Sequence, residues 1–105
     1  MQKKIAVIKG DGIGPEVVGQ AIHVLNAVAE HYQHHFHYQY GLMGADAIEK
    51  TGQPLPDSTI EMCLNSDAIL FGAIGHPRYD NDPSAKVRPE QGLLKLRKSL
   101  QLFAN

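Results

Sequence analysis

Residues 4–16 read KIAVIKGDGIGPE, and this stretch decides the fold that we predict for the chain. The β-rich run 4–8 is typical of a buried strand, and it ends at Gly10. A glycine-rich turn follows, and Pro15 then opens a helix, because proline suits the first helical position, where its missing N–H would be unpaired anyway. A strand, a tight turn and a helix in this order predict the opening of an α/β fold.

The helix that begins at Pro15 carries one apolar stripe, since its apolar residues recur at spacings of three and four. The residues of this stripe are Val18, Ala21, Ile22, Leu25, Val28, Ala29 and Tyr32. Next, residues 35–40 alternate strictly between aromatic and polar side chains. This alternation predicts a strand with one face exposed.

The rest of the chain continues the alternation of helices and strands. Residues 44–50 are predicted to form a short helix. The spacing of Ser58 and Glu61 is that of a capping box, which predicts another helix from there to about Asn65. Residues 68–74 are apolar on both faces, which predicts a central strand of a parallel sheet.

A polar, proline-containing loop is expected over residues 75–88. Pro89 then opens a last helix, whose apolar residues extend to Phe103 and which has no convincing stop signal. With three strands and several helices in alternation, we predict a layered α/β fold.

Composition narrows the class of protein. The chain has 105 residues, enough for at most one modest domain, and ten basic against eleven acidic residues argue against a nucleic-acid or anionic-membrane partner. Its apolar runs are too short to span a bilayer, and we recognise no signal peptide. The single cysteine, Cys63, lies in an apolar helical pattern, so we expect a buried, unreactive thiol in a reducing, cytoplasmic setting.

The glycine-rich turn invites a nucleotide-binding interpretation. A dinucleotide fingerprint needs the spacing GxGxxG, whereas Gly10, Gly12 and Gly14 follow GxGxG. Glu16 would also compete with a bound phosphate for the N–H groups at the helix start. We therefore reject a Rossmann site, and two interpretations remain open: a purely structural turn, or a turn that approaches a ligand through its backbone.

Four histidines, at positions 31, 34, 35 and 37, resemble a metal cluster. His35 and His37 would share one face of a strand. Zinc usually needs three or four converging ligands, so we favour a solvated strand face and predict no metal site here.

The segment 88–97 is the most informative for function. On a helix, Glu90, Leu93, Leu94 and Arg97 would share one face. This pattern suits core leucines flanked by charges. Periodicity alone favours that interpretation, but the pattern also suits a ligand with an alkyl group beside a carboxylate, which the arginine would bind through paired hydrogen bonds. The chemistry of these residues leaves both interpretations open.

The sequence resembles a known family in four places. GDGIGPE at 10–16 resembles the amino-terminal signature of the β-decarboxylating dehydrogenases, which act on isopropylmalate, isocitrate or tartrate. Residues 52–56, 70–75 and 88–105 resemble the isopropylmalate branch of that family. Essentially the whole chain is covered by the resemblance.

The resemblance implies roles for particular residues. Arg97 is similar to the substrate-carboxylate arginine of the family, and Leu93 and Leu94 match its pocket for the isopropyl group. A further set matches positions that line the NAD site. These cofactor-binding candidates are Ile13, Gly75, His76, Pro77 and Glu90. His76 departs from many relatives, which have glycine there, so its contact with the cofactor is an open question.

The resemblance also implies a fold and an activity. We expect the layered α/β/α fold of isopropylmalate dehydrogenases, distinct from the Rossmann fold, with residues 1–105 forming the amino-terminal part of the first, cofactor-side domain. The expected reaction is the NAD-dependent oxidative decarboxylation of 3-isopropylmalate to 2-oxoisocaproate in leucine biosynthesis, with Mg²⁺ or Mn²⁺, in a cytoplasmic homodimer. Isocitrate, tartrate or malate are the alternative substrates.

Part of the expected site is missing from these 105 residues. In the family the metal ligands and the acid/base residues follow later in the chain, so we expect no catalytic and no metal-binding residue here. We therefore expect the fragment by itself to be inactive. A catalytically silent fragment or binding module is the alternative from another class.

Overall fold

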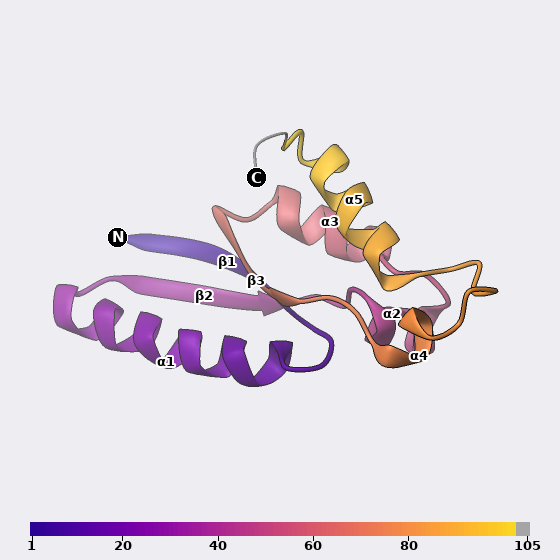
Figure 1. Ribbon diagram of the computed structural model, residues 1–105. Helices are drawn as coiled ribbons and strands as arrows, with labels where there is room; N and C mark the ends of the chain where they lie inside the picture. Colours follow the sequence, from indigo (N-terminus) through magenta and orange to yellow (C-terminus); the bar gives the residue numbers. More distant parts are fainter. Residues whose placement is uncertain (103–105) are drawn as a thin grey trace.

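The computed structural model describes residues 1–102 of the chain, and Figure 1 shows its architecture. Three strands and five helices alternate along the described residues. In chain order they are β1 (Gln2–Gly10), α1 (Gly14–Tyr32), β2 (His35–Tyr40), α2 (Ala45–Thr51), α3 (Asp57–Leu64), β3 (Ala68–Ala73), α4 (Pro77–Asp80) and α5 (Pro89–Ser99). The predicted α/β fold is confirmed, while the expected place of Phe103 in the last helix lies outside the described residues.

The three strands form a parallel sheet in the order β2-β1-β3. Ile5 of β1 is paired with Tyr38 of β2 on one side and with Ala68 of β3 on the other. The prediction that residues 68–74 form a central strand was wrong for the described sheet, in which β1 is central and β3 is an edge strand. An apolar run shows that helices cover both faces of a strand, but it does not give the strand's place in the sheet.

Helices cover both faces of the sheet, so the fold has three layers (Figure 1). On one face, Ile5 and Val7 pack against Val18 of α1. On the other face, Ala6 and Ile8 join a second core cluster. The buried partners of Ala6 and Ile8 are Met43, Leu55, Cys63 and Leu96. Because successive side chains of β1 point to opposite faces, one short strand supplies both cores.

Two other local predictions were wrong. Ser58 does not cap α3: the helix begins at Asp57 after Pro56, and no side chain caps it. The expected loop 75–88 contains the short helix α4, in which the Nδ1 atom of His76 accepts a hydrogen bond of 3.1 Å from the backbone N–H of Arg78.

The ends of α1 and of α5 share an uncommon feature. Gln33 and Gln101 both have a φ of 58°, in the left-handed region that favours glycine. In each case the next N–H closes the helix, from His34 to the carbonyl of Ala29 at 2.8 Å and from Leu102 to that of Arg97, also at 2.8 Å. This is the usual helix-ending geometry without its glycine, which explains why the sequence offered no stop signal.

We predict that Gln33→Gly stabilises the chain, because a glycine relieves the left-handed strain, which costs about 1–2 kcal/mol for an L-residue. The expected gain is about 0.5–1 kcal/mol in the free energy of unfolding, measured by urea denaturation, after allowance for the greater freedom of glycine in the unfolded chain. Gln20→Gly, at an exposed position inside α1, is the control and should destabilise by about 1 kcal/mol. A loss of stability in Gln33→Gly would contradict the strain argument.

Candidate functional site

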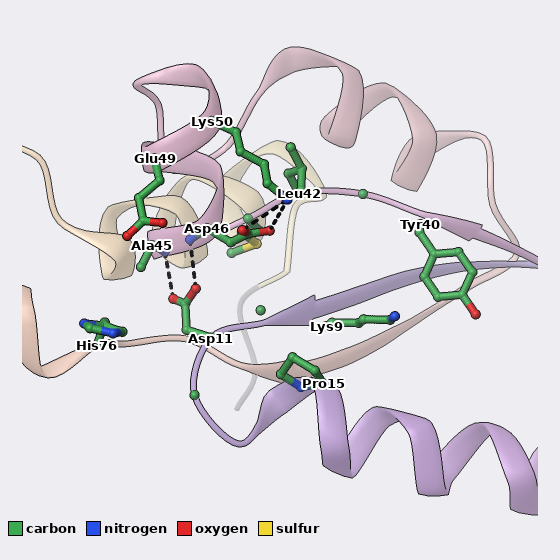
Figure 2. Close-up of a pocket in the computed structure, with 14 residues that line it drawn as sticks. Lys9, Asp11, Pro15, Tyr40, Leu42, Ala45, Asp46, Glu49, Lys50 and His76 are labelled. Carbon is green, nitrogen blue, oxygen red and sulfur yellow. Dashed lines mark hydrogen bonds and ion pairs between the residues drawn. The ribbon is translucent and has the colours of Figure 1, made fainter.

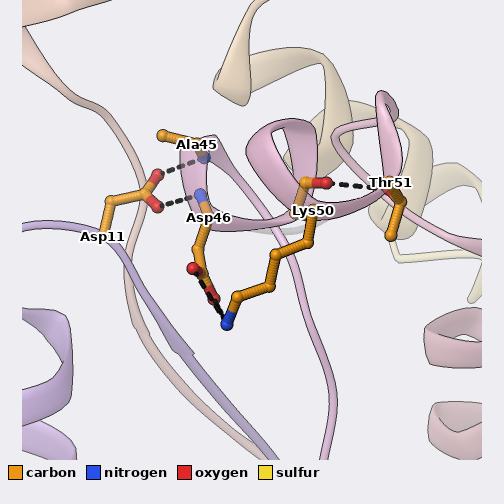
Figure 3. Close-up of polar contacts among 6 residues, drawn as sticks. Asp11, Ala45, Asp46, Lys50 and Thr51 are labelled. Atoms are coloured by element: carbon orange, nitrogen blue, oxygen red, sulfur yellow. Dashed lines mark hydrogen bonds and ion pairs between the residues drawn. The ribbon is translucent and has the colours of Figure 1, made fainter.

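A buried carboxylate joins three segments at the carboxyl ends of the strands. Asp11 follows β1, and only 6% of its surface is exposed. Its Oδ2 atom accepts hydrogen bonds from the backbone N–H groups of Ala45 at 2.8 Å and Gly75 at 3.1 Å, and its Oδ1 atom accepts one from Asp46 at 3.0 Å. Figure 3 shows the two bonds to α2. Asp11 thus connects the glycine-rich turn to the start of α2 and to the segment after β3.

The backbone around this carboxylate depends on glycine. Gly44 precedes α2 with a φ of 83°, and a Cβ there would collide with the carboxylate of Asp11. A side chain at position 44 therefore cannot cap α2, and Asp11 takes the capping role from a distant part of the chain, where a carboxylate also suits the positive end of the helix. Gly75 has a φ of 129°, which L side chains rarely adopt.

Several of the cofactor-binding candidates lie together at this edge of the sheet. A Cβ on Gly75 would lie 3.4 Å from Oε1 of Glu90, and a Cβ on Gly12 would lie 4.0 Å from the carbonyl oxygen of Gly75. The turn after β1, the segment after β3 and the first turn of α5 are therefore neighbours. Beside them, Ile13 is 64% exposed although it is apolar. His76 and Pro77 continue from Gly75 into α4.

The substrate-binding candidates lie further along α5. With a rise of about 1.5 Å per residue, Arg97 is about 10 Å along the axis from Glu90. Leu94 is 64% exposed, whereas Leu93 is half-buried and packs on the core cluster beneath α5. Arg97 is half-buried and forms no ion pair with any of residues 1–102. The structure therefore separates the two leucines by burial, which periodicity could not do.

A cleft of about 520 Å³ opens beside Asp11, between the end of β2, the glycine-rich turn and α2 (Figure 2). Charged side chains line it, among them Lys9, Asp46, Glu49 and Lys50. Nζ of Lys50 lies 3.3 Å from Oδ1 of Asp46, and Nζ of Lys9 lies 5.0 Å from the centre of the Tyr40 ring. The residues that line this cleft come from three separate segments with no shared motif, so no pattern in the sequence indicates it.

Arg88 holds the segment between α4 and α5. Its guanidinium donates hydrogen bonds of 2.8 Å to the backbone carbonyls of Tyr79 and Asp82. Asp82 in turn accepts hydrogen bonds from the backbone N–H and the hydroxyl of Ser84, which lower the pKa of its exposed carboxyl. These contacts order the polar segment that sequence analysis described only as a loop. The only sequence signal for this ordering is that an arginine, Arg88, stands immediately before a predicted helix.

The other features considered from the sequence are the histidines, Cys63 and a possible membrane span. His35 and His37 share an exposed strand face with ring centres 4.8 Å apart, and within residues 1–102 no three His, Cys, Asp or Glu side chains gather into a potential metal site. Cys63 is buried, as predicted, and burial raises the pKa of its thiol. In the described part of the chain, no helix has the length and apolarity to cross a membrane.

Fold and site together define a three-layered α/β protein with converging backbone turns at the carboxyl edge of a parallel sheet. The family model described as isocitrate/isopropylmalate dehydrogenase matches residues 4–105. The chain therefore belongs to the isocitrate/isopropylmalate dehydrogenase family, which confirms the resemblance inferred from the glycine-rich turn.

Individual relatives agree with this assignment. The chain is 57% identical over 105 residues to a 3-isopropylmalate dehydrogenase from Bacteroides fragilis, across 100% of the chain and 30% of that protein. It is 58% identical over 102 residues to one from Aquifex aeolicus, across 97% of the chain and 28% of that protein. The chain thus spans less than a third of the length of these relatives.

Solved structures support the same fold. The isocitrate dehydrogenase of Methylococcus capsulatus matches with a TM-score of 0.76 and 31% identity, over 96% of this chain and 26% of that one. A β-decarboxylating dehydrogenase of Thermococcus kodakarensis matches with a TM-score of 0.71 and 36% identity, over 95% and 27%.

We predict that Arg88→Ala loosens the segment between α4 and α5, because two backbone carbonyls lose their charged donor. Hydrogen–deuterium exchange of the amides in residues 79–88 should become at least about tenfold faster, which corresponds to a loss of about 1.4 kcal/mol of protection. Arg78→Ala is the matched control: its 3.3 Å ion pair with Glu49 is exposed on both sides, so little change is expected. Equal effects of the two variants would show that Arg88 does not order the segment.

Proposed function

We propose that this chain is the amino-terminal part of the first, cofactor-side domain of an NAD-dependent 3-isopropylmalate dehydrogenase. The complete enzyme would convert 3-isopropylmalate to 2-oxoisocaproate in leucine biosynthesis. The observation that carries the proposal is the face of α5, where the exposed side chain of Leu94 lies between those of Glu90 and Arg97. The 3-isopropylmalate dehydrogenases among its relatives, at 57–58% identity, support the choice of substrate.

Arg97 would bind a carboxylate of the substrate. A guanidinium matches a carboxylate through two parallel hydrogen bonds, and the half-buried position of Arg97 strengthens such a pair relative to a fully solvated one. Leu94, one helical turn before it, would cover the isopropyl group, with Leu93 contributing from its place at the core. A carboxylate beside a branched alkyl group is the chemistry of 3-isopropylmalate.

The residues after β1 and β3 fit one edge of a dinucleotide. The backbone at Gly12 is open, Gly75 carries no side chain, and the exposed apolar Ile13 offers a surface for a flat ring. Ile13, Gly75, His76, Pro77 and Glu90 would therefore hold NAD against this edge of the sheet, with Glu90 at the boundary between cofactor and substrate. Bound there, NAD supplies the acceptor for the hydride.

Residues outside this chain would complete the enzyme. The described residues offer no set of metal ligands, so the Mg²⁺ or Mn²⁺ of the proposed reaction, which polarises the substrate hydroxyl, would bind elsewhere. The same holds for the acid/base groups. We further propose that the complete enzyme is a cytoplasmic homodimer with a small-molecule substrate and neither nucleic-acid nor membrane partners.

A sister enzyme that acts on isocitrate is the second candidate, because one solved structure of this fold is an isocitrate dehydrogenase. Isocitrate carries a carboxymethyl group where 3-isopropylmalate carries its isopropyl group, and Leu94 would leave the charge of that third carboxylate without a partner. The leucine therefore favours the alkyl substrate.

The test of the proposed function uses a full-length chimera, in which these 105 residues replace the matching part of the Bacteroides fragilis relative. With NAD and Mg²⁺, we expect NADH formation from isopropylmalate and much less from isocitrate, tartrate or malate. The 105-residue chain alone, as the control, should form no NADH, since groups that act as a unit are missing. A chimera that prefers isocitrate would refute the proposed substrate.

In the same chimera, we predict that Leu94→Ala weakens discrimination for isopropylmalate over malate. Loss of this apolar contact is worth about 1–3 kcal/mol of selectivity, read from the ratio of kcat/KM values. Leu64→Ala is the matched control, since Leu64 is 60% exposed at the end of α3 and lies outside the proposed site. An unchanged ratio in Leu94→Ala would remove this residue from the pocket.

We also predict that Arg97→Lys lowers kcat/KM for isopropylmalate by at least about tenfold, because lysine loses the paired hydrogen bonds. Arg97→Ala should lose considerably more. Lys98→Ala, one residue further on at an exposed position, should have near-normal kinetics. Near-normal kinetics for Arg97→Ala would show that Arg97 is a surface charge without a substrate role.

A further inference from the structure

We propose that Asp11 is a positioning residue for the cofactor side of the site: its carboxylate fixes the segment after β3 relative to the glycine-rich turn. The proposal rests on the proposed function, because it assigns to Asp11 the geometry of the residues that would hold NAD. In this proposal Asp11 would act on the cofactor through the backbone of Gly75, whose N–H it binds, and not by touching the cofactor or the substrate itself.

The hydrogen bonds of Asp11 carry this inference. One oxygen, Oδ2, is shared between Ala45 at the start of α2 and Gly75 after β3, at 2.8 and 3.1 Å. The backbone N–H of Asp11 also donates to the carbonyl of Ala73 at 2.7 Å. Asp11 therefore forms hydrogen bonds on both sides of Ile74. Its main-chain N–H donates to Ala73, and its side chain accepts from Gly75.

The conformation of Gly75 shows why a side-chain acceptor is needed there. With a φ of 129°, the backbone at Gly75 has left the extended geometry of β3. Its N–H donates to Oδ2 of Asp11. A charged acceptor gives stronger hydrogen bonds than a neutral one. Without it, Gly75 is free to take one of the many other backbone conformations open to glycine.

A change at Gly75 would be passed on to the proposed cofactor residues along the chain. His76 and Pro77 follow Gly75 in the chain, and Oε1 of Glu90 lies 3.4 Å from the position of a Cβ on Gly75. A shift of Gly75 therefore displaces Gly75 itself, His76 and Pro77, three of the five residues proposed to hold NAD, relative to Glu90 on α5. Leu93, Leu94 and Arg97 stand on α5, which packs on the core cluster through Leu93 and Leu96 and receives none of the hydrogen bonds of the Asp11 carboxylate.

If Asp11 positions the proposed cofactor residues and not the substrate residues on α5, its loss should affect the binding of NAD selectively in the chimera. Asp11→Ala should raise the KM for NAD by at least about tenfold, while the KM for isopropylmalate changes by less than about threefold. Asp11→Asn is the conservative rescue: its amide oxygen can still accept from Ala45 and Gly75, and only the bond to Asp46 is lost. Its KM for NAD should rise by no more than about threefold.

Thr59→Val is the matched control for a purely structural role. Thr59 is buried, and its hydroxyl donates a hydrogen bond of 2.8 Å to the carbonyl of Leu42, away from Gly75. It should lower the Tm while leaving the KM for NAD within about twofold of the wild type. If Thr59→Val and Asp11→Ala raise that KM alike for equal losses of Tm, or if Asp11→Ala raises both KM values alike, the positioning role is refuted.

A second measurement keeps this inference separable from the proposed function. In the 105-residue chain, Asp11→Asn should accelerate hydrogen–deuterium exchange at Asp46 by at least about tenfold and leave Gly75 protected, whereas Asp11→Ala should expose both amides. If the wild-type chimera forms no NADH from any of the four acids, the proposed function fails, and exchange alone decides on Asp11. Should Asp11→Ala fail to fold, Asp11→Asn decides: unchanged exchange at Asp46, or fast exchange at Gly75, overturns the proposal.

Discussion

A single buried carboxylate joins parts of this fold that the sheet alone leaves separate. Strand pairing fixes β1, β2 and β3 relative to one another, and apolar packing holds α1 on one face and α3 and α5 on the other. Neither determines where α2 begins or where the chain goes after β3. Asp11 binds both through backbone N–H groups, and because a buried charge is costly unless it is satisfied, the arrangement tolerates few alternatives.

The architecture was largely predictable from the sequence, whereas the geometry of the site was not. Strands and helices follow local periodicity, as in 4–16, where apolar run, glycines and proline agree. The partners of Asp11 lie 34, 35 and 64 positions away, so no local pattern announces them. The helix α4 has four residues, too few for an apolar period. The different burial of Leu93 and Leu94 depends on how α5 sits on the core, which periodicity leaves open.

The position of α5 shows how packing and site geometry are linked. Gly92 allows the helix to approach the turn before α3, because a Cβ there would lie 2.7 Å from the carbonyl oxygen of Pro54. That same carbonyl accepts a hydrogen bond of 2.8 Å from the N–H of Gly44, immediately before α2. The carbonyl group of Pro54 therefore contacts both α5, which carries the proposed substrate residues, and the residue before α2, the helix that Asp11 caps.

The central place of β1 has a consequence for synthesis. A ribosome releases β1 before β2 and β3, which cover its two edges and follow at residues 35–40 and 68–73. The backbone groups at the two edges of β1 therefore stay unpaired until β2, and later β3, have been synthesised. Since each addition joins the growing sheet at an open edge, assembly can proceed outward in the order in which the ribosome delivers the chain.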